Sequence, residues 1–188
     1  MFSRQEDLTD VKKKAFCTYA VLLAIVFPAQ AFHLRFFDYL VPLYLFAVPL
    51  VLKRRTNINF SVRHILLGLL VSLIILLPFF AVFSPGKKFV PMGLGAALFQ
   101  LLGISFPEEV YFRGFLQEVF GNDLRGAVIV SLLFAGAHLP GLFFYGDSYA
   151  PLTFIPSLVM GLLYMRTSNV VPSTIFHFLS NVMYLGSL

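Results

Sequence analysis

Long apolar runs separated by short polar stretches dominate the chain. A helix that crosses a bilayer needs about 20 largely apolar residues. Seven runs approach that length, at residues 15–32, 39–52, 65–83, 89–106, 126–139, 150–165 and 170–188. The later runs are shorter and contain Gly and Pro, which membrane helices tolerate when other helices rather than lipid surround them. The pattern predicts an all-α fold, a polytopic transmembrane helix bundle with about seven spans, in a range of roughly six to eight.

The composition narrows the class of protein. Of the 188 residues, 59% are hydrophobic and 12% are charged, whereas soluble domains carry about 45–50% and about 25%. This balance excludes an ordinary soluble domain, a disordered chain and a nucleic-acid-binding protein. Cys17 is the only cysteine, so an intramolecular disulfide framework is excluded too. We expect residues 1–188 to form one integral membrane domain, with N-terminal membrane helices at 1–88 and the candidate chemistry at 89–188.

The basic residues are concentrated in short segments beside the first apolar runs. The net charge is +5, and most Lys and Arg residues precede Val71. Because short cytoplasmic loops are enriched in Lys and Arg, the N-terminus and the loop between the second and third runs are predicted to be cytoplasmic. Counting spans onward returns residues 107–125 to that side and places Lys87 and Lys88 outside, against the rule. The two clusters comprise Arg4 with residues 12–14, and residues 53–55 with Arg63.

An acidic pair stands at the end of the fourth apolar run. Glu108 and Glu109 follow Pro107, which suits the first turn of a helix, so both carboxylates are predicted near a helix N-terminus. The helix dipole favours negative charge there. Glu109 and Arg113 are four residues apart and can pair on one helix face, while Glu108 points about 100° away. An acidic helix start that pairs with an arginine at the membrane surface is the structural alternative to a catalytic role.

Two further polar pairs lie in later apolar runs. Phe134 and His138 are four residues apart and share a helix face, and so do His177 and Asn181. Each pair taken alone is also compatible with helix packing or with an interhelical hydrogen bond. Ionisable groups within a membrane protein usually face the bundle interior. We therefore expect the acidic pair and the two later pairs to converge inside the bundle.

The combined set suits hydrolysis of an amide bond without a covalent intermediate. A glutamate held near a histidine can activate a water molecule. A neutral His177 and the amide of Asn181 can donate hydrogen bonds to a developing oxyanion. These residue types do not by themselves choose between Glu108 and Glu109 as the base.

Three motifs, taken in order, resemble those of the CPBP family of CAAX proteases and bacteriocin-processing enzymes, also called the ABI family. They are EExxxR at 108–113, FxxxH at 134–138 and HxxxN at 177–181, and the resemblance covers roughly residues 106–183. It implies an all-helical intramembrane glutamate protease that uses no cofactor and no metal. The protein would lie in the lipid bilayer of a prokaryotic plasma (inner) membrane and act on a membrane-associated protein or peptide.

The resemblance also implies a role for each motif residue. Glu108 would be the general base that activates water, assisted by His138. His177 and Asn181 would form the oxyanion site. The supporting residues would be Glu109, Arg113 and Phe134.

Other classes of protein compete with this interpretation. A zinc-dependent intramembrane protease is one, because Glu and His side chains ligate zinc, although the chain has no HExxH motif. A non-catalytic bacteriocin-immunity or membrane scaffold protein of the same fold is another. A small transporter is disfavoured, because the chain shows no pair of broken helices in corresponding halves. For a protease, candidate substrates are a prenylated CAAX tail, a leader peptide and a C-terminal sorting signal.

Overall fold

The structure is a computed structural model that describes residues 8–52, 54–83 and 88–187. Arg4, Lys53 and Lys87 of the charge pattern lie outside the described residues. All regular elements in the described ranges are helices, which confirms the all-α prediction. In chain order they are α1 (Leu8–Ala31), α2 (Phe37–Val51), α3 (Val62–Phe83), α4 (Leu94–Leu98), η1 (Phe99–Ser105), α5 (Phe106–Tyr111), η2 (Phe112–Gln117), α6 (Glu118–Phe120), α7 (Leu124–Tyr145), η3 (Ala150–Thr153), α8 (Phe154–Thr167) and α9 (Val170–Gly186).

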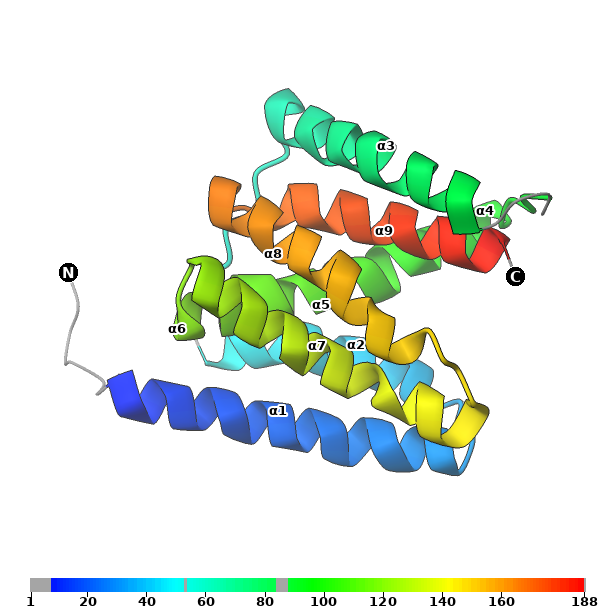
Figure 1. Ribbon diagram of the computed structural model, residues 1–188. Coiled ribbons are helices and arrows are strands. Elements are labelled where there is room, and N and C mark those ends of the chain that lie inside the picture. The colour runs from blue at the N-terminus through cyan, green and yellow to red at the C-terminus, as the bar shows by residue number, and fades with distance from the viewer. Residues whose placement is uncertain (1–7, 53, 84–87, 188) are drawn as a thin grey trace.

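The helices form a bundle in which α1 and α3 lie on opposite sides (Figure 1). The helices α7, α8 and α9 lie between them, because α1 packs on α7, α8 contacts both α7 and α9, and α9 packs along α3. The helix α5 contacts both α2 and α9. This arrangement brings the segments that carry the three motifs together in the middle of the bundle.

Three helices of the described chain are long and apolar enough to cross a membrane, namely α1, α3 and α7. Large apolar side chains of α3 point outward, and Leu66 and Leu73 are both 57% exposed. Contiguous exposed apolar surface of this kind is typical of a membrane-facing helix. About seven spans stays a prediction, because α8 has 14 residues and α9 has 17, fewer than the roughly 20 that a full crossing needs.

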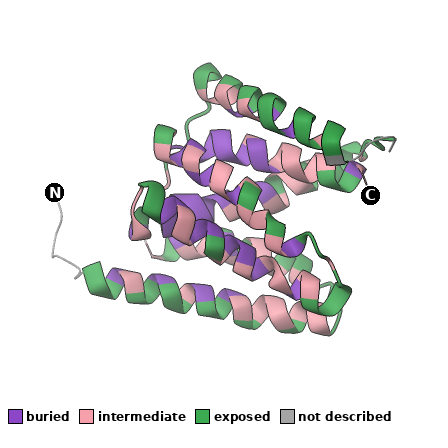
Figure 2. Cartoon of the chain, viewed as in Figure 1, coloured by how far each residue is buried: buried purple, intermediate pink, exposed green. Residues whose placement is uncertain are grey.

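The core lies along the segment that follows the acidic pair. Tyr111, Phe112, Phe115 and Leu116 are at most 2% exposed, and Figure 2 shows buried residues concentrated on this segment and on the facing sides of α7, α8 and α9. The side of the membrane on which residues 107–125 lie stays a prediction, but most of this segment is buried inside the bundle. Its Glu109 and Arg113 pair with one another there, whereas its Glu118 and Arg125 are exposed.

Two short turns determine where the helices of the site begin. Gly121, with φ of 123°, ends α6. Asp123 then caps α7, since its Oδ1 accepts a hydrogen bond of 2.8 Å from the backbone N–H of Gly126. A Cβ atom at Gly126 would overlap the carbonyl oxygen of Gly121, so this tight turn requires glycine. Asn169 caps α9 in the same way through its side-chain oxygen.

The helix α7 extends beyond the run that the sequence delimited. It contains Pro140 and continues to Tyr145, so the helix does not end with the apolar run at residue 139, and His138 lies inside it. A proline removes one backbone hydrogen bond, and a helix surrounded by other helices tolerates that loss. Gly146, in the left-handed region, ends the helix instead.

One end of the bundle combines polar cross-links with basic side chains. Asn57 donates a hydrogen bond to the carbonyl of Ser168, and Asn122 donates one to the Ser168 hydroxyl. These bonds join the segment before α3 and the turn before α7 to the turn between α8 and α9. In Figure 1, α1, α3, α7 and α9 begin at this end and α8 finishes there. The basic residues near these helix ends include Lys12, Arg63, Arg125 and Arg166.

Candidate active site

A single helical stretch carries the acidic pair. From Leu94 to Phe120 the backbone stays helical through α4, η1, α5, η2 and α6, and Ser105 and Phe106 already have right-handed helical angles. Glu108 and Glu109 therefore lie in the middle of a helix, and the expectation that they lie at a helix N-terminus is wrong. The helix dipole acts only within the first turn, so their charges are compensated by side chains instead.

Wide π-helical turns on both sides explain how the stretch continues through Pro107. In η1 the hydrogen bonds span five residues, and the N–H of Phe106 still bonds to the carbonyl of Leu101. A second π-helical turn, η2, follows at Phe112–Gln117. Pro107 lacks an N–H, and the wide turn before it accommodates the missing bond. π-Helical turns of this kind often occur at functional sites.

Glu109 forms a fully buried ion pair with Arg113. Arg113 Nε lies 3.3 Å from Glu109 Oε2, and both side chains are 0% exposed, as the four-residue spacing predicts. Arg113 Nη2 also donates to the carbonyl and to the hydroxyl of Ser157 on α8, at 3.1 and 2.8 Å. The guanidinium lies 5.6 Å from the centre of the Phe134 ring. These contacts hold the arginine between its own helical stretch and the two helices α7 and α8.

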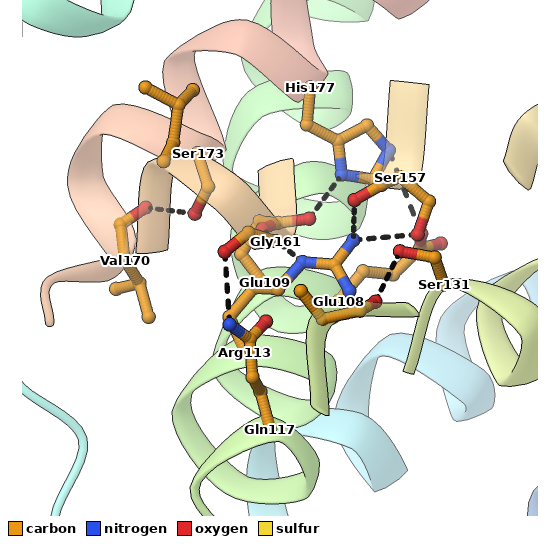
Figure 3. A network of polar contacts seen from close by, with 12 residues as sticks. Glu108, Glu109, Arg113, Gln117, Ser131, Ser157, Gly161, Val170, Ser173 and His177 are labelled. Atoms are coloured by element: carbon orange, nitrogen blue, oxygen red, sulfur yellow. Dashed lines mark hydrogen bonds and ion pairs between the residues drawn. The ribbon is translucent and has the colours of Figure 1, made fainter. Parts of the chain in front are cut away.

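His177 of α9 lies between the two carboxylates (Figure 3). Its Nδ1 is 3.0 Å from Glu109 Oε1, a hydrogen-bonding distance, and its Nε2 is 3.7 Å from Glu108 Oε2. The His177 side chain is 5% exposed and that of Glu108 is 16% exposed. Two of the predicted motifs are thus joined directly by one imidazole ring.

The Phe134 ring brings the third motif into contact with the others. It stacks on the His138 ring with centroids 4.5 Å apart, and it meets the His177 ring edge-on at 5.6 Å. His138 Nδ1 lies 2.8 Å from the carbonyl oxygen of Phe134. A carbonyl only accepts, so Nδ1 carries the proton, and in the neutral ring Nε2 is an acceptor. Among the described residues the ion-pair partner of Glu108 is His177, and His138 reaches the group through Phe134.

Asn181, one turn after His177, bonds to a residue that the sequence did not single out. Its Nδ2 donates to Oε1 of Gln100 on η1 at 3.2 Å. Gln100 stands in an apolar run, and an isolated polar residue there was the available signal. Ser157, the partner of Arg113, is a second such residue in the run that forms α8. Both have partners on another helix, which spacing along one helix does not reveal.

The structure therefore unites the predicted residues through two groups of contacts. Glu108, Glu109, Arg113 and His177 form one connected polar group, and the Phe134 ring links His138 to it. Asn181 lies on the same helix as His177 and is held by Gln100. Within the residues that the structure describes, no three His, Cys, Asp or Glu side chains are grouped as ligands for a metal ion.

The polar group lies within the part of the chain that a protein-family model matches. The sequence model of the family described as Type II CAAX prenyl endopeptidase Rce1-like matches residues 90–183, half of the chain, and these include all three motifs. The chain belongs to this CAAX protease family. Membership indicates, at the level of the family, an integral membrane protease that acts on membrane-associated proteins. No curated protein and no solved structure matches the chain significantly.

Proposed function

We propose that the protein is an intramembrane, metal-independent glutamate-type endopeptidase with Glu108 as the general base. The observation that carries the proposal is the buried group of Glu108, Glu109, Arg113 and His177, held by contacts of 3.0 to 3.7 Å. Strong electrostatics in a site with little water are what hydrolysis within a membrane requires. Residues 89–188 would be the catalytic core, and the helices of residues 1–88 would surround it.

The different surroundings of the two glutamates support Glu108 as the base. Glu109 is fully buried, and its two oxygens face Arg113 and His177. Glu108 is more exposed and its approach to His177 is longer, whereas the Oε2 atoms of both glutamates form no hydrogen bond within the described residues. A base must reach water and accept a proton from it, and the partly exposed Glu108 can do so more readily than Glu109, which is fully buried between Arg113 and His177.

The geometry revises the protonation proposed for His177. A carboxylate accepts hydrogen bonds, so Nδ1–H of His177 donates to Glu109 and a neutral ring would leave Nε2 unprotonated. An oxyanion donor at Nε2 therefore requires the imidazolium form. Two carboxylates, one guanidinium and one imidazolium give zero net charge, and burial strongly favours such compensation.

The reaction then proceeds in two proton transfers. Water attacks the scissile carbonyl carbon while Glu108 takes one of its protons. The carbonyl oxygen becomes an oxyanion that accepts hydrogen bonds from Nε2–H of His177 and from the Asn181 amide. When the C–N bond breaks, the protonated Glu108 gives its proton to the leaving amine. His138, with Nε2 as an acceptor, would orient the attacking water.

Gln100 and Phe134 would position these groups without touching the substrate. Gln100 Oε1 accepts only from the Asn181 nitrogen, so the bond fixes which end of the amide is the donor. One Nδ2 proton points to Gln100 and the other is available to an oxyanion. The Phe134 ring lies against both imidazoles and restricts their rotation.

The family match favours a prenylated CAAX-type protein tail over a leader peptide or a C-terminal sorting signal as the substrate. The basic residues at one end of the bundle support a cytoplasmic N-terminus, and we propose that the membrane is a prokaryotic plasma membrane. A CAAX tail on a cytoplasmic, lipid-anchored protein would approach the site from that side.

Peptide cleavage by the purified protein tests the proposal. Internally quenched peptides that represent the three substrate types are incubated with the wild type, with Glu108→Gln and with Asp38→Asn, each with and without a chelator. Asp38 is an exposed carboxylate at the start of α2, so its variant is the matched control. We expect the CAAX-type peptide to be cleaved, Glu108→Gln to lower the rate by about 10²–10⁴, and the control to match the wild type.

Three results would contradict parts of this proposal, and two of them would favour a competing class of protein. Loss of cleavage on chelation alone would support the zinc-dependent enzyme. Equal cleavage by the wild type and Glu108→Gln would exclude Glu108 as the base. A wild type that cleaves none of the peptides would support the non-catalytic immunity or scaffold protein.

A further inference from the structure

A pocket outside the candidate active site combines two cations with an apolar floor. It has a volume of about 270 Å³ and is lined by Lys12 and Phe16 of α1, Phe120 of α6, and Arg125 and Ile129 of α7. The Phe16 and Phe120 rings meet edge-on, with centroids 4.9 Å apart. None of the residues that line this pocket belongs to the polar group around His177.

The two helices that form its walls run in the same direction. Tyr19 of α1 donates to the carbonyl of Leu133 in α7, and further along Tyr145 of α7 donates to the carbonyl of Gln30 in α1. Because α1 and α7 are parallel, the two helices place their side chains in the same order along the pocket. Each has a cation and then, one turn further along its axis, an apolar side chain. Lys12 precedes Phe16 by four residues, and Arg125 precedes Ile129 by four. The pocket is therefore polar at one end and apolar at the other.

The cations of the pocket lack carboxylate partners inside the described chain. Neither Lys12 nor Arg125 forms an ion pair with a described residue, whereas the neighbouring Lys13 lies 3.8 Å from Asp10. The nearby carboxylate of Asp123 is already engaged, since its Oδ1 accepts from the backbone N–H of Gly126. Two basic side chains in one pocket, next to an apolar floor, leave net positive charge that an anion would neutralise.

We propose that this pocket binds the phosphate of an anionic phospholipid. Lys12 and Arg125 hold the phosphate, and the first methylene groups of the acyl chains lie over Phe16, Phe120 and Ile129. Basic pockets between membrane helices bind lipid headgroups of this chemistry. A choline headgroup is disfavoured, because its own cation would oppose Lys12 and Arg125. The orientation also fits the bundle, because Lys12 and Arg125 lie near the starts of α1 and α7, and these two helices begin at the same end of the bundle (Figure 1).

Lipid binding to the purified, delipidated full chain tests the proposal. Bound lipids are counted by native mass spectrometry during titration with dioctanoyl phosphatidylglycerol, with dioctanoyl phosphatidylcholine as the zwitterionic arm and glycerol phosphate as the soluble arm. The test variant is Lys12→Gln/Arg125→Gln. The matched control is Lys13→Gln/Arg166→Gln, which removes the same charge from exposed residues that do not line the pocket.

We expect the test variant to weaken phosphatidylglycerol binding by about thirtyfold, because each of the two cations contributes a factor of about five to the affinity for an anionic lipid. The control should retain wild-type affinity within about threefold. Lys12→Arg/Arg125→Lys keeps both charges and should bind like the wild type. Equal weakening in the test and control variants would overturn the proposal, since it would indicate general surface charge. Equal affinity for phosphatidylcholine, or displacement by glycerol phosphate at similar concentrations, would also overturn it.

Discussion

The Nδ1 atom of His177 lies 3.0 Å from Oε1 of Glu109, although the two residues are 68 positions apart. This contact helps to join α9 to α5 inside the bundle. It leaves the opposite edge of the ring facing Glu108, so one imidazole lies between the fully buried carboxylate and the carboxylate that we propose as the base.

Substitution of the two adjacent glutamates should have different effects on stability and on catalysis. Glu109→Gln removes the charge that compensates a fully buried Arg113, which should destabilise the fold by about 3–5 kcal/mol. Glu108→Gln, at a partly exposed residue with a longer contact to His177, should destabilise the fold less than Glu109→Gln does and should lower the turnover number by about 10²–10⁴. Unfolding by sodium dodecyl sulfate in mixed micelles, measured beside peptide cleavage, distinguishes the two effects. A Glu108→Gln protein that is destabilised as much as Glu109→Gln, or a Glu109→Gln protein as stable as the wild type, would contradict the assignment.

Ser157 should contribute to stability through Arg113. Ser157→Ala removes the 2.8 Å bond from Arg113 Nη2 to the hydroxyl and keeps the bond to the carbonyl. Hydrogen bonds to charged groups contribute about 1.5–3 kcal/mol, and a loss of that size is expected in the free energy of unfolding. Ser131→Ala is the control, because Ser131 is equally buried but bonds only to the carbonyl of Ala127 in its own helix. Its loss should be smaller, and equal losses would show that Arg113 does not depend on Ser157.

Gln100 should affect catalysis more than binding. Gln100→Leu frees the Asn181 amide to rotate, so we expect the turnover number to fall by about tenfold with little change in KM. Gln100→Glu keeps an acceptor for Asn181 Nδ2 and should restore most of the rate. Steady-state kinetics on the cleaved peptide separates the two parameters. A larger KM with an unchanged turnover number would instead place Gln100 in substrate binding.

The contact between α1 and α7 can be tested by a double-mutant cycle. A Cβ atom at Gly136 would lie 2.6 Å from the Tyr19 hydroxyl oxygen, so Gly136→Ala should destabilise the bundle by about 1–3 kcal/mol. Tyr19→Phe removes the hydroxyl and its bond to Leu133, at a cost of about 1 kcal/mol. The double variant should be more stable than the sum of the single losses predicts. Strict additivity, measured by the same unfolding assay, would exclude this close approach.

The parts of the site that depend on one helix could be predicted from the sequence. The four-residue spacings of Glu109 with Arg113 and of Phe134 with His138 place these side chains together on any helix. The apolar runs likewise predicted α1, α2 and α3 to within a few residues, except at the start of α1. The resemblance to the family motifs added the prediction that the three motif-bearing segments lie together in the fold.

The parts that depend on packing could not be predicted. The partners of Asn181 and Arg113 lie on other helices, so Gln100 and Ser157 resembled ordinary polar residues in apolar runs. Pro107 and Pro140 suggested helix boundaries, because a lone helix breaks at proline. In the bundle the π-helical turn η1 and neighbouring helices offset the missing bonds, and both helices continue.

The π-helical turn η1 also sets the orientation of Gln100 relative to Glu108 around the helix axis. Such a turn is equivalent to a regular helix that contains one additional residue, and each residue of a helix rotates its successors by about 100°. Deleting one residue from Phe99–Ser105 would convert the π-helical turn into regular helix and rotate the segments before and after it relative to one another. Either Gln100 would then turn away from Asn181, or Glu108 would turn away from His177. The relative orientation of the Gln100 amide and the two carboxylates therefore depends on the number of residues in η1. An insertion or deletion there would disrupt this orientation without altering any side chain of the polar group.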